Sequence, residues 1–148
     1  MHVFKGYLAA ATTGLALILA TPLAAQEGIE APVAEAIRDY MDFATYGAGI
    51  ITPQQIDEEV FKAAVFIDTR DAHQFEARTI PGATNIEWRE IPARLDELPT
   101  DRMVILFCNT GSLSGQALFA ARLLGRENVL MLETGIDGWS QTAAYKPS

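Results

Sequence analysis

Three short apolar runs, each the length of a buried strand, constrain the fold of this chain most. They cover residues 63–67, 104–107 and 129–132, and each is continuous rather than alternating. Continuous apolar runs are typical of strands covered on both faces, as in parallel sheets. Helical patterns separate the runs, including apolar residues at three- and four-residue steps between 116 and 124. This order predicts an α/β fold with a parallel sheet, although periodicity alone defines no finer topology.

Turn and capping signals predict the shorter elements between these runs. Thr52 and Pro53 begin a helix that runs to Phe61, with Gln55 completing a capping box. The other expected elements are a short helix over 71–76, a turn over 80–83, a strand over 84–86, a helix over 91–98 and a terminal helix or turn from 135 to 139.

Residues 1–25 have the three-part pattern of a secretory signal peptide. Lys5 precedes an apolar stretch over 7–20, and small residues over 21–25 offer a cleavage site. The alternative is an uncleaved membrane anchor, but a spanning helix needs about 20 apolar residues. We therefore expect export to the periplasm, with no stable membrane insertion after cleavage. Leu23 departs from the preferred small residue, so the cleavage site itself stays open.

The charge balance limits the classes of partner. The whole chain has a formal charge of −8, and removal of residues 1–25 takes away Lys5 and no acidic residue. The mature chain is therefore still more acidic. An acidic exported domain is a poor match for nucleic acid or for an anionic membrane surface, and we expect neither as a partner.

Residues 26–51 are predicted to form a helical extension ahead of the main domain. Apolar residues repeat with helical spacing between Pro32 and Ala44, and the glycines at 47 and 49 end the pattern. Pro32 is expected in the first helical turn. Such a stripe usually faces a core, which favours a helix that packs on the domain. The alternative is that the helix 32–44 is a docking element for a partner.

Cys108 is the chain's only cysteine, so no internal disulfide can form. An unpaired cysteine in an oxidising compartment is a liability unless it is buried or used. Cys108 directly follows the 104–107 strand, Gly111 permits a tight turn, and Ser114 is the expected N-cap of the next helix. Helix N-terminal amides stabilise a thiolate, so Cys108 is predicted to be a nucleophile.

Four separated strings resemble one family, the rhodanese domains. Residues 66–70 resemble the family's I-D-V-R strand end, and residues 75–86 resemble its segment ending in I-P-G-A-x-N-I. Cys108 to Ser114 is similar to the C-x-x-G-x-x-S active loop, and residues 135–139 resemble the closing G-G-x-x-x-W element. The strings occur in family order, which identifies residues 52–148 as a rhodanese domain.

The resemblance implies a central parallel five-stranded sheet flanked by helices, and sulfur transfer through a persulfide on Cys108. The implied substrate-binding loop consists of Asn109, Thr110, Gly111, Ser112, Leu113 and Ser114. The implied partners are a small sulfur donor, such as thiosulfate or a persulfide, and a thiophilic acceptor or protein thiol. No cofactor and no metal is expected.

The loop departs from the family's thiosulfate-using members, which commonly carry Arg or Lys where this chain has Asn109 or Ser112. Arg70 and Arg78 are therefore candidates for the pocket rim that could supply the missing charge. A cysteine phosphatase is excluded, because its arginine clamp would stand where this chain has Ser114. A non-catalytic binding or sensory module, using the loop for an anion or a partner thiol, remains the alternative to a sulfurtransferase.

Overall fold

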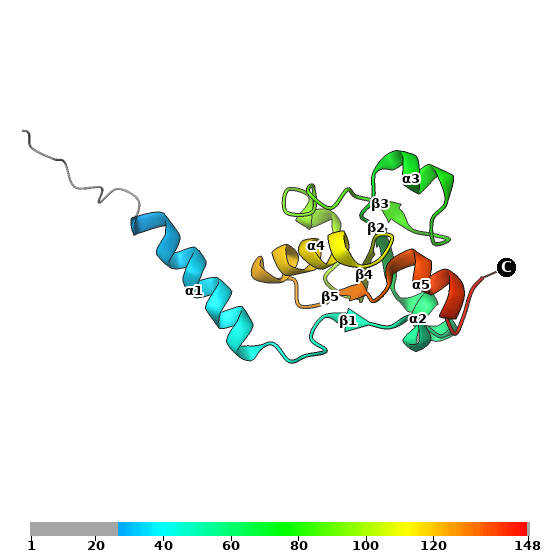
Figure 1. Ribbon diagram of the computed structural model, residues 1–148, viewed down its shortest axis with the longest axis horizontal. Helices are drawn as coiled ribbons and strands as arrows, with labels where there is room; N and C mark the ends of the chain where they lie inside the picture. The colour runs from blue at the N-terminus through cyan, green and yellow to red at the C-terminus, as the bar shows by residue number, and fades with distance from the viewer. Residues whose placement is uncertain (1–26, 148) are drawn as a thin grey trace, which may run out of the picture.

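The structure, a computed structural model, describes residues 27–147 (Figure 1). Its helices are α1 (Glu27–Phe43), α2 (Glu58–Ala63), α3 (Ala72–Ala77), α4 (Ser112–Leu123) and α5 (Gly135–Thr142), with 3-10 turns η1 (Pro53–Gln55) and η2 (Leu95–Glu97). Its strands are β1 (Ile50–Ile51), β2 (Val65–Asp68), β3 (Thr84–Asn85), β4 (Val104–Phe107) and β5 (Val129–Leu132). The predicted signal peptide lies outside the described residues and stays a prediction.

The strands form one five-stranded sheet in the order β1-β5-β4-β2-β3, and every pair is parallel. The α/β fold with a central parallel sheet is thereby confirmed. All four residues of β4 are buried, because this strand lies at the centre of the sheet with helices on both faces. The three apolar runs of the sequence are the three inner strands β5, β4 and β2.

Each inner strand supplies both faces of the sheet, because successive side chains point to opposite sides. Ile67 and Leu106 pack on one side with Ala117 and Ala121 of α4. The alternate residues, Phe66, Ile105 and Phe107, pack on the other side with Ile136 and Trp139 of α5. This double coverage explains why the strands read as continuous apolar runs.

The parallel register brings the ends of β2, β3 and β4 to the same level. Asp68 stands opposite Phe107 in β4 and opposite Asn85 in β3. The residues that follow each strand therefore meet at one edge of the sheet, where ligands bind in open α/β folds. Cys108 and Arg70 both lie at this edge.

Two of the predicted helices are wrong in extent. The helix expected from Thr52 to Phe61 is divided into η1 and α2, because Asp57 interrupts it and caps α2 by accepting a hydrogen bond from the Val60 amide (2.9 Å). The helix expected over 91–98 is reduced to η2. Pro92 disfavours a helical backbone at the residue before it, while the buried Ile91 and Leu98 mimic helical spacing.

The short strand β1 was not predicted, and it occupies the last two residues of the expected helical extension. It pairs with β5, and its Ile51 is buried in the core on the α5 side. A two-residue strand leaves no periodic signal, because alternation needs about four residues to be recognised. The sheet therefore begins ahead of residue 52.

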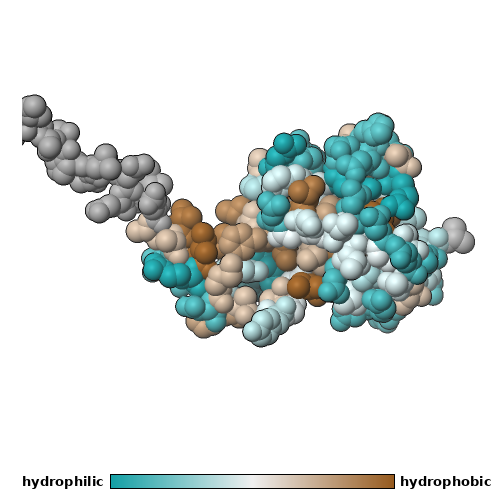
Figure 2. Space-filling view, viewed as in Figure 1, coloured by the Kyte–Doolittle hydropathy of each residue, from teal (hydrophilic) through white to brown (hydrophobic). Residues whose placement is uncertain are grey.

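Helix α1 projects from the domain instead of lying against it (Figure 1). It begins at Glu27, so Pro32 lies inside the helix and not in its first turn as expected. Its contact with α4 includes an edge-to-face pair between Tyr40 and Phe119, with ring centroids 5.2 Å apart. Val33 and Met41 are exposed, and hydrophobic residues gather over α1 (Figure 2). The expectation that this stripe faces the core is therefore wrong. No helix in the described range, 27–147, has the length and apolar content to cross a membrane.

Removing residues 1–45 is expected to lower the free energy of unfolding by only about 1 kcal/mol, the value of one aromatic pair. The physical reason is that, among residues 31–43 of α1, only Ile37 and Tyr40 are even partly buried. Urea denaturation of the truncated chain measures this change, and Tyr40→Ala in the full chain is the matched control. A loss of several kcal/mol in the truncated chain alone would contradict the exposed placement of α1.

Candidate active site

Cys108 lies directly after β4, and its side chain is almost fully buried, with 2% of the residue exposed. Helix α4 begins four residues later, with Gly111 as its N-cap at a left-handed φ of 101°. Glycine adopts this conformation without steric cost. The prediction of Ser114 as N-cap is therefore wrong, because Ser114 lies within the first turn of α4. Its hydroxyl oxygen lies within hydrogen-bond reach of two acceptors, the Gly111 carbonyl oxygen (3.1 Å) and the Cys108 Sγ (3.6 Å), and can donate its one proton to either.

The Cys108 sulfur lies in a cradle of hydrogen-bond donors. The Gly111 amide donates to Sγ at 3.2 Å, in addition to the Ser114 hydroxyl. Burial alone raises the pKa of the Cys108 thiol, but hydrogen bonds from Ser114 and from loop amides outweigh burial. The resulting pKa lies below the ordinary value of 9.0, so the fraction present as nucleophilic thiolate near neutral pH is increased.

The N-terminus of α5 holds the loop in place. The Ile136 amide donates to the carbonyl oxygen of Cys108 (2.9 Å), and the Asp137 amide donates to that of Asn109 (3.1 Å). These two carbonyl oxygens are therefore occupied by α5. Thr134, just before α5, has a φ of 61°, which is uncommon for a β-branched residue and marks local backbone strain beside the loop.

Arg70 is not at the pocket rim, contrary to expectation. It is 4% exposed, and its guanidinium donates to both carboxylate oxygens of Asp68, at 2.9 and 2.6 Å. This hydrogen bonding raises the pKa of Arg70, so the group stays charged. A further N–H donates to the Asn109 side-chain oxygen (3.1 Å). Arg70 is therefore a buried side chain that contacts the loop through Asn109, and its charge is paired with Asp68.

The other loop side chains divide into inward-held and exposed groups. The side-chain Nδ2 of Asn109 donates to the Gln74 side-chain oxygen (2.7 Å), which turns the Asn109 side chain toward α3. Thr110, Ser112 and Leu113 are exposed, with the two hydroxyl oxygens 3.4 Å apart. The loop mouth thus offers hydroxyl and apolar groups and carries no charge of its own.

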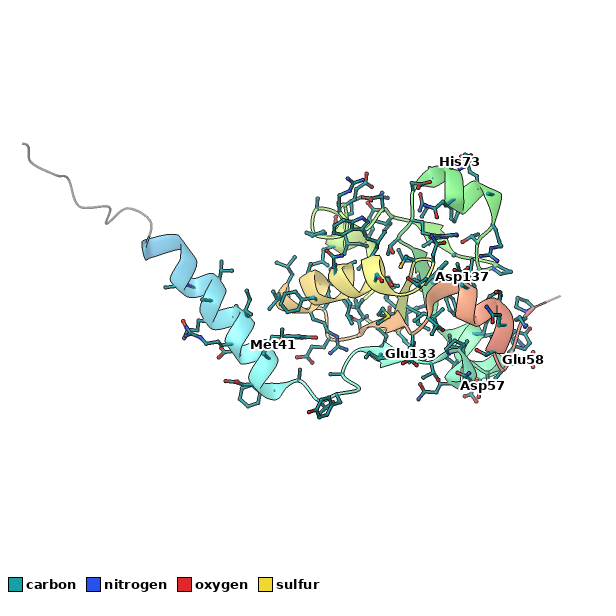
Figure 3. The ribbon with its side chains drawn as sticks, viewed as in Figure 1. Met41, Asp57, Glu58, His73, Glu133 and Asp137 are labelled. Carbon is teal, nitrogen blue, oxygen red and sulfur yellow. The ribbon has the colours of Figure 1, made fainter. Side chains whose placement is uncertain are left out.

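The Arg78 side chain is exposed, but its charge is paired with a carboxylate. Its guanidinium forms an ion pair with Asp137 of α5 at 2.8 Å (Figure 3 labels Asp137). This pair joins the segment after α3 to the first turn of α5, beside the loop. His73 lies on the outer side of α3, exposed (Figure 3), and among the described contacts it makes none with Cys108.

A pocket of about 450 Å³ borders the loop at Thr110. Its remaining lining comes from the segment around η1 and from β5 to α5, namely Pro53, Gln54, Glu133, Thr134, Asp137, Gly138, Gln141 and Thr142. Sequence reasoning missed Glu133 and Thr134. Their position directly after an inner strand was the signal that could have located them. Within residues 27–147 no group of three His, Cys, Asp or Glu residues could hold a metal ion.

Replacing Ser114 by Ala is expected to shift the alkylation of Cys108 to higher pH. Loss of the hydroxyl donor destabilises the thiolate, which raises the thiol pKa and lowers the thiolate fraction at pH 7 by roughly fivefold. The measurement is the rate of iodoacetamide alkylation between pH 5 and 10. Ser112→Ala is the matched control, because the Ser112 hydroxyl pairs with Thr110 instead of Sγ. Identical profiles for the two variants would contradict the role assigned to Ser114.

The chain belongs to the rhodanese-like domain family, whose match covers residues 52–142. A protein of Allochromatium vinosum named sulfurtransferase is 32% identical over 77 residues, which cover 52% of this chain and 72% of that protein. The uncharacterized protein YqhL of Bacillus subtilis is 34% identical over 88 residues, covering 57% of this chain and 70% of the relative. A rhodanese-related crystal structure from Thermoplasma volcanium aligns with a TM-score of 0.56 at 25% identity, covering 62% of this chain and 89% of that one.

Proposed function

We propose that the protein is a sulfurtransferase in which Cys108 carries the transferred sulfur as a persulfide. The observation that carries this proposal is the buried sulfur at the N-terminus of α4, with the Gly111 amide and the Ser114 hydroxyl directed at it. Such a cradle stabilises an anionic sulfur, as each hydrogen bond to a charged acceptor is worth about 1.5–3 kcal/mol. The sulfurtransferase name of the Allochromatium relative supports the same class of activity.

The proposed reaction has two displacement steps. The Cys108 thiolate attacks the sulfane sulfur of the donor, the donor's bond to that sulfur breaks, and the remainder of the donor leaves with the electron pair. The acceptor then attacks the outer sulfur of the persulfide, and the pair of the S–S bond returns to Cys108. The thiolate is regenerated, so no external oxidant or reductant is required.

The charges around the loop favour a persulfide donor over thiosulfate. Thiosulfate is a dianion and needs fixed positive charge for its sulfonate group. Arg70 is buried against Asp68, and Arg78 is paired with Asp137. Neither guanidinium is therefore available to compensate for the missing basic residue in the loop. Export to the periplasm remains part of the proposal, resting on the pattern of residues 1–25.

Mass spectrometry after exposure to a donor tests the function. The purified protein is expected to gain the mass of one sulfur on Cys108 from a small-molecule persulfide, and less readily from thiosulfate. Cyanide is expected to discharge the label, since it attacks the outer sulfur. If the folded protein takes no label from either donor, the proposal fails and the non-catalytic binding module is favoured.

A further inference from the structure

The pocket beside the active loop has an acidic lining. Glu133 follows β5, and Asp137 lies in the first turn of α5 (both labelled in Figure 3). The remaining lining is polar or small, including Gln54, Gln141 and Thr134, and among the described residues no lysine or arginine lines it. The pocket therefore presents two carboxylates to whatever enters it.

This pocket and the nucleophile's loop share one wall. Thr110 belongs to both, and α5 holds the carbonyl oxygens of Cys108 and Asn109 through its first amides. The Asp137 backbone amide, which belongs to the pocket lining, donates to the Asn109 carbonyl oxygen at 3.1 Å, so the loop and the pocket lining are in direct contact. A persulfide extends the reactive sulfur about 2 Å beyond Sγ. Cys108 itself does not line the pocket, but Thr110 does, and the Thr110 backbone amide is one of the donors to the Cys108 sulfur. A molecule held in the pocket therefore lies beside a residue that contacts the reacting atom.

Only one of the two carboxylates forms an ion pair with a basic side chain. Arg78 contacts Asp137 at 2.8 Å, with both side chains about half exposed. Glu133 is exposed, and among the described residues it forms no ion pair. The lining therefore keeps an uncompensated negative charge at Glu133. A negative pocket attracts a cationic group and repels an anionic one, and salt weakens both effects.

We propose that this pocket binds the sulfur acceptor, and that the acceptor is a small thiol carrying an ammonium group. The inference rests on the proposed function, because it assigns the second substrate of the same site. A volume of about 450 Å³ lies within the range of small-molecule sites. The acceptor thiol loses its proton to solvent, and its thiolate attacks the outer persulfide sulfur. The S–S bond breaks, Cys108 leaves as thiolate, and the acceptor departs as a persulfide.

Single-turnover discharge of the sulfur-loaded protein tests the inference. Cysteamine, 2-mercaptoethanol and 3-mercaptopropionate have nearly the same size and carry positive, neutral and negative end groups. With rates corrected for thiolate fraction, cysteamine is expected to react about tenfold faster than 3-mercaptopropionate at low salt. The preference is expected to shrink toward unity as salt rises.

Glu133→Gln is expected to reduce the ratio of the cysteamine rate to the mercaptopropionate rate severalfold. Glu127→Gln is the matched control, because Glu127 precedes β5 at the opposite edge of the sheet, and it should leave the ratio unchanged. Equal rates for all three thiols, or an unchanged rate ratio in Glu133→Gln, would overturn the inference. If Cys108 still took up sulfur in that case, the proposed function would stand. Failure of Cys108 to load from any donor would overturn both.

Discussion

Replacing Cys108 by Ser is expected to abolish sulfur transfer and to leave the fold intact. A serine hydroxyl is not ionised at neutral pH and forms no persulfide, so the covalent route is lost. The transfer rate should fall by roughly 10³-fold or more, as for other removed nucleophiles. The rate is measured with a persulfide donor and a small thiol acceptor, together with the mass of the protein after loading.

Two comparisons separate loss of chemistry from loss of structure in this experiment. The hydroxyl of Cys108→Ser can accept from the Gly111 amide that donates to Sγ, so its thermal unfolding midpoint should stay close to that of the parent protein. Cys108→Ala removes the acceptor as well, and it should be equally inactive. Residual transfer in both variants would show that the reaction does not proceed through Cys108.

The sequence predicted the structure best where a residue pattern is compatible with only one arrangement in the fold. The continuous apolar run of β4 can be buried only between two layers, and the parallel arrangement then places Cys108 at the carboxyl edge of the sheet. The position of Cys108 therefore follows from composition and order alone. The cradle of loop amides around the sulfur follows in the same way from Gly111 and the start of α4.

The features that sequence reasoning missed depend on contacts between distant segments. In the sequence, Arg70 has no evident partner and was predicted to offer a free positive charge to the site. In the structure it is paired with the nearby Asp68, and it also donates to Asn109, which is 39 residues further along the chain. Serine is a common N-cap residue, which is why Ser114 was predicted to cap α4, but the left-handed Gly111 caps the helix three residues earlier. The same holds for Glu133 and Asp137, whose shared pocket exists only once α5 folds back on the loop.

Replacing Gly135 by Ala is expected to cost at least about 3 kcal/mol of unfolding free energy, because it combines backbone strain with a steric conflict. Gly135 has a φ of 56°, in the left-handed region that alanine enters only at a cost. An added Cβ would lie 2.4 Å from the Cys108 carbonyl oxygen and 2.5 Å from that of Asn109. Helix α5 would have to withdraw and lose the hydrogen bonds that it donates to both oxygens.

Gly82→Ala is the matched control, because it isolates the backbone strain. Gly82 has a φ of 82°, but an added Cβ meets no atom within 4 Å, so its cost should be about 1 kcal/mol. Urea denaturation gives both free energies, and alkylation of Cys108 reports the state of the loop. Since α5 holds the loop through the carbonyl oxygens of Cys108 and Asn109, its withdrawal should disturb the loop amides that donate to the sulfur. Gly135→Ala should therefore also raise the pH at which Cys108 reacts, whereas Gly82→Ala should not. Equal losses of stability in the two variants would mean that α5 does not hold the loop as closely as its hydrogen bonds to Cys108 and Asn109 require.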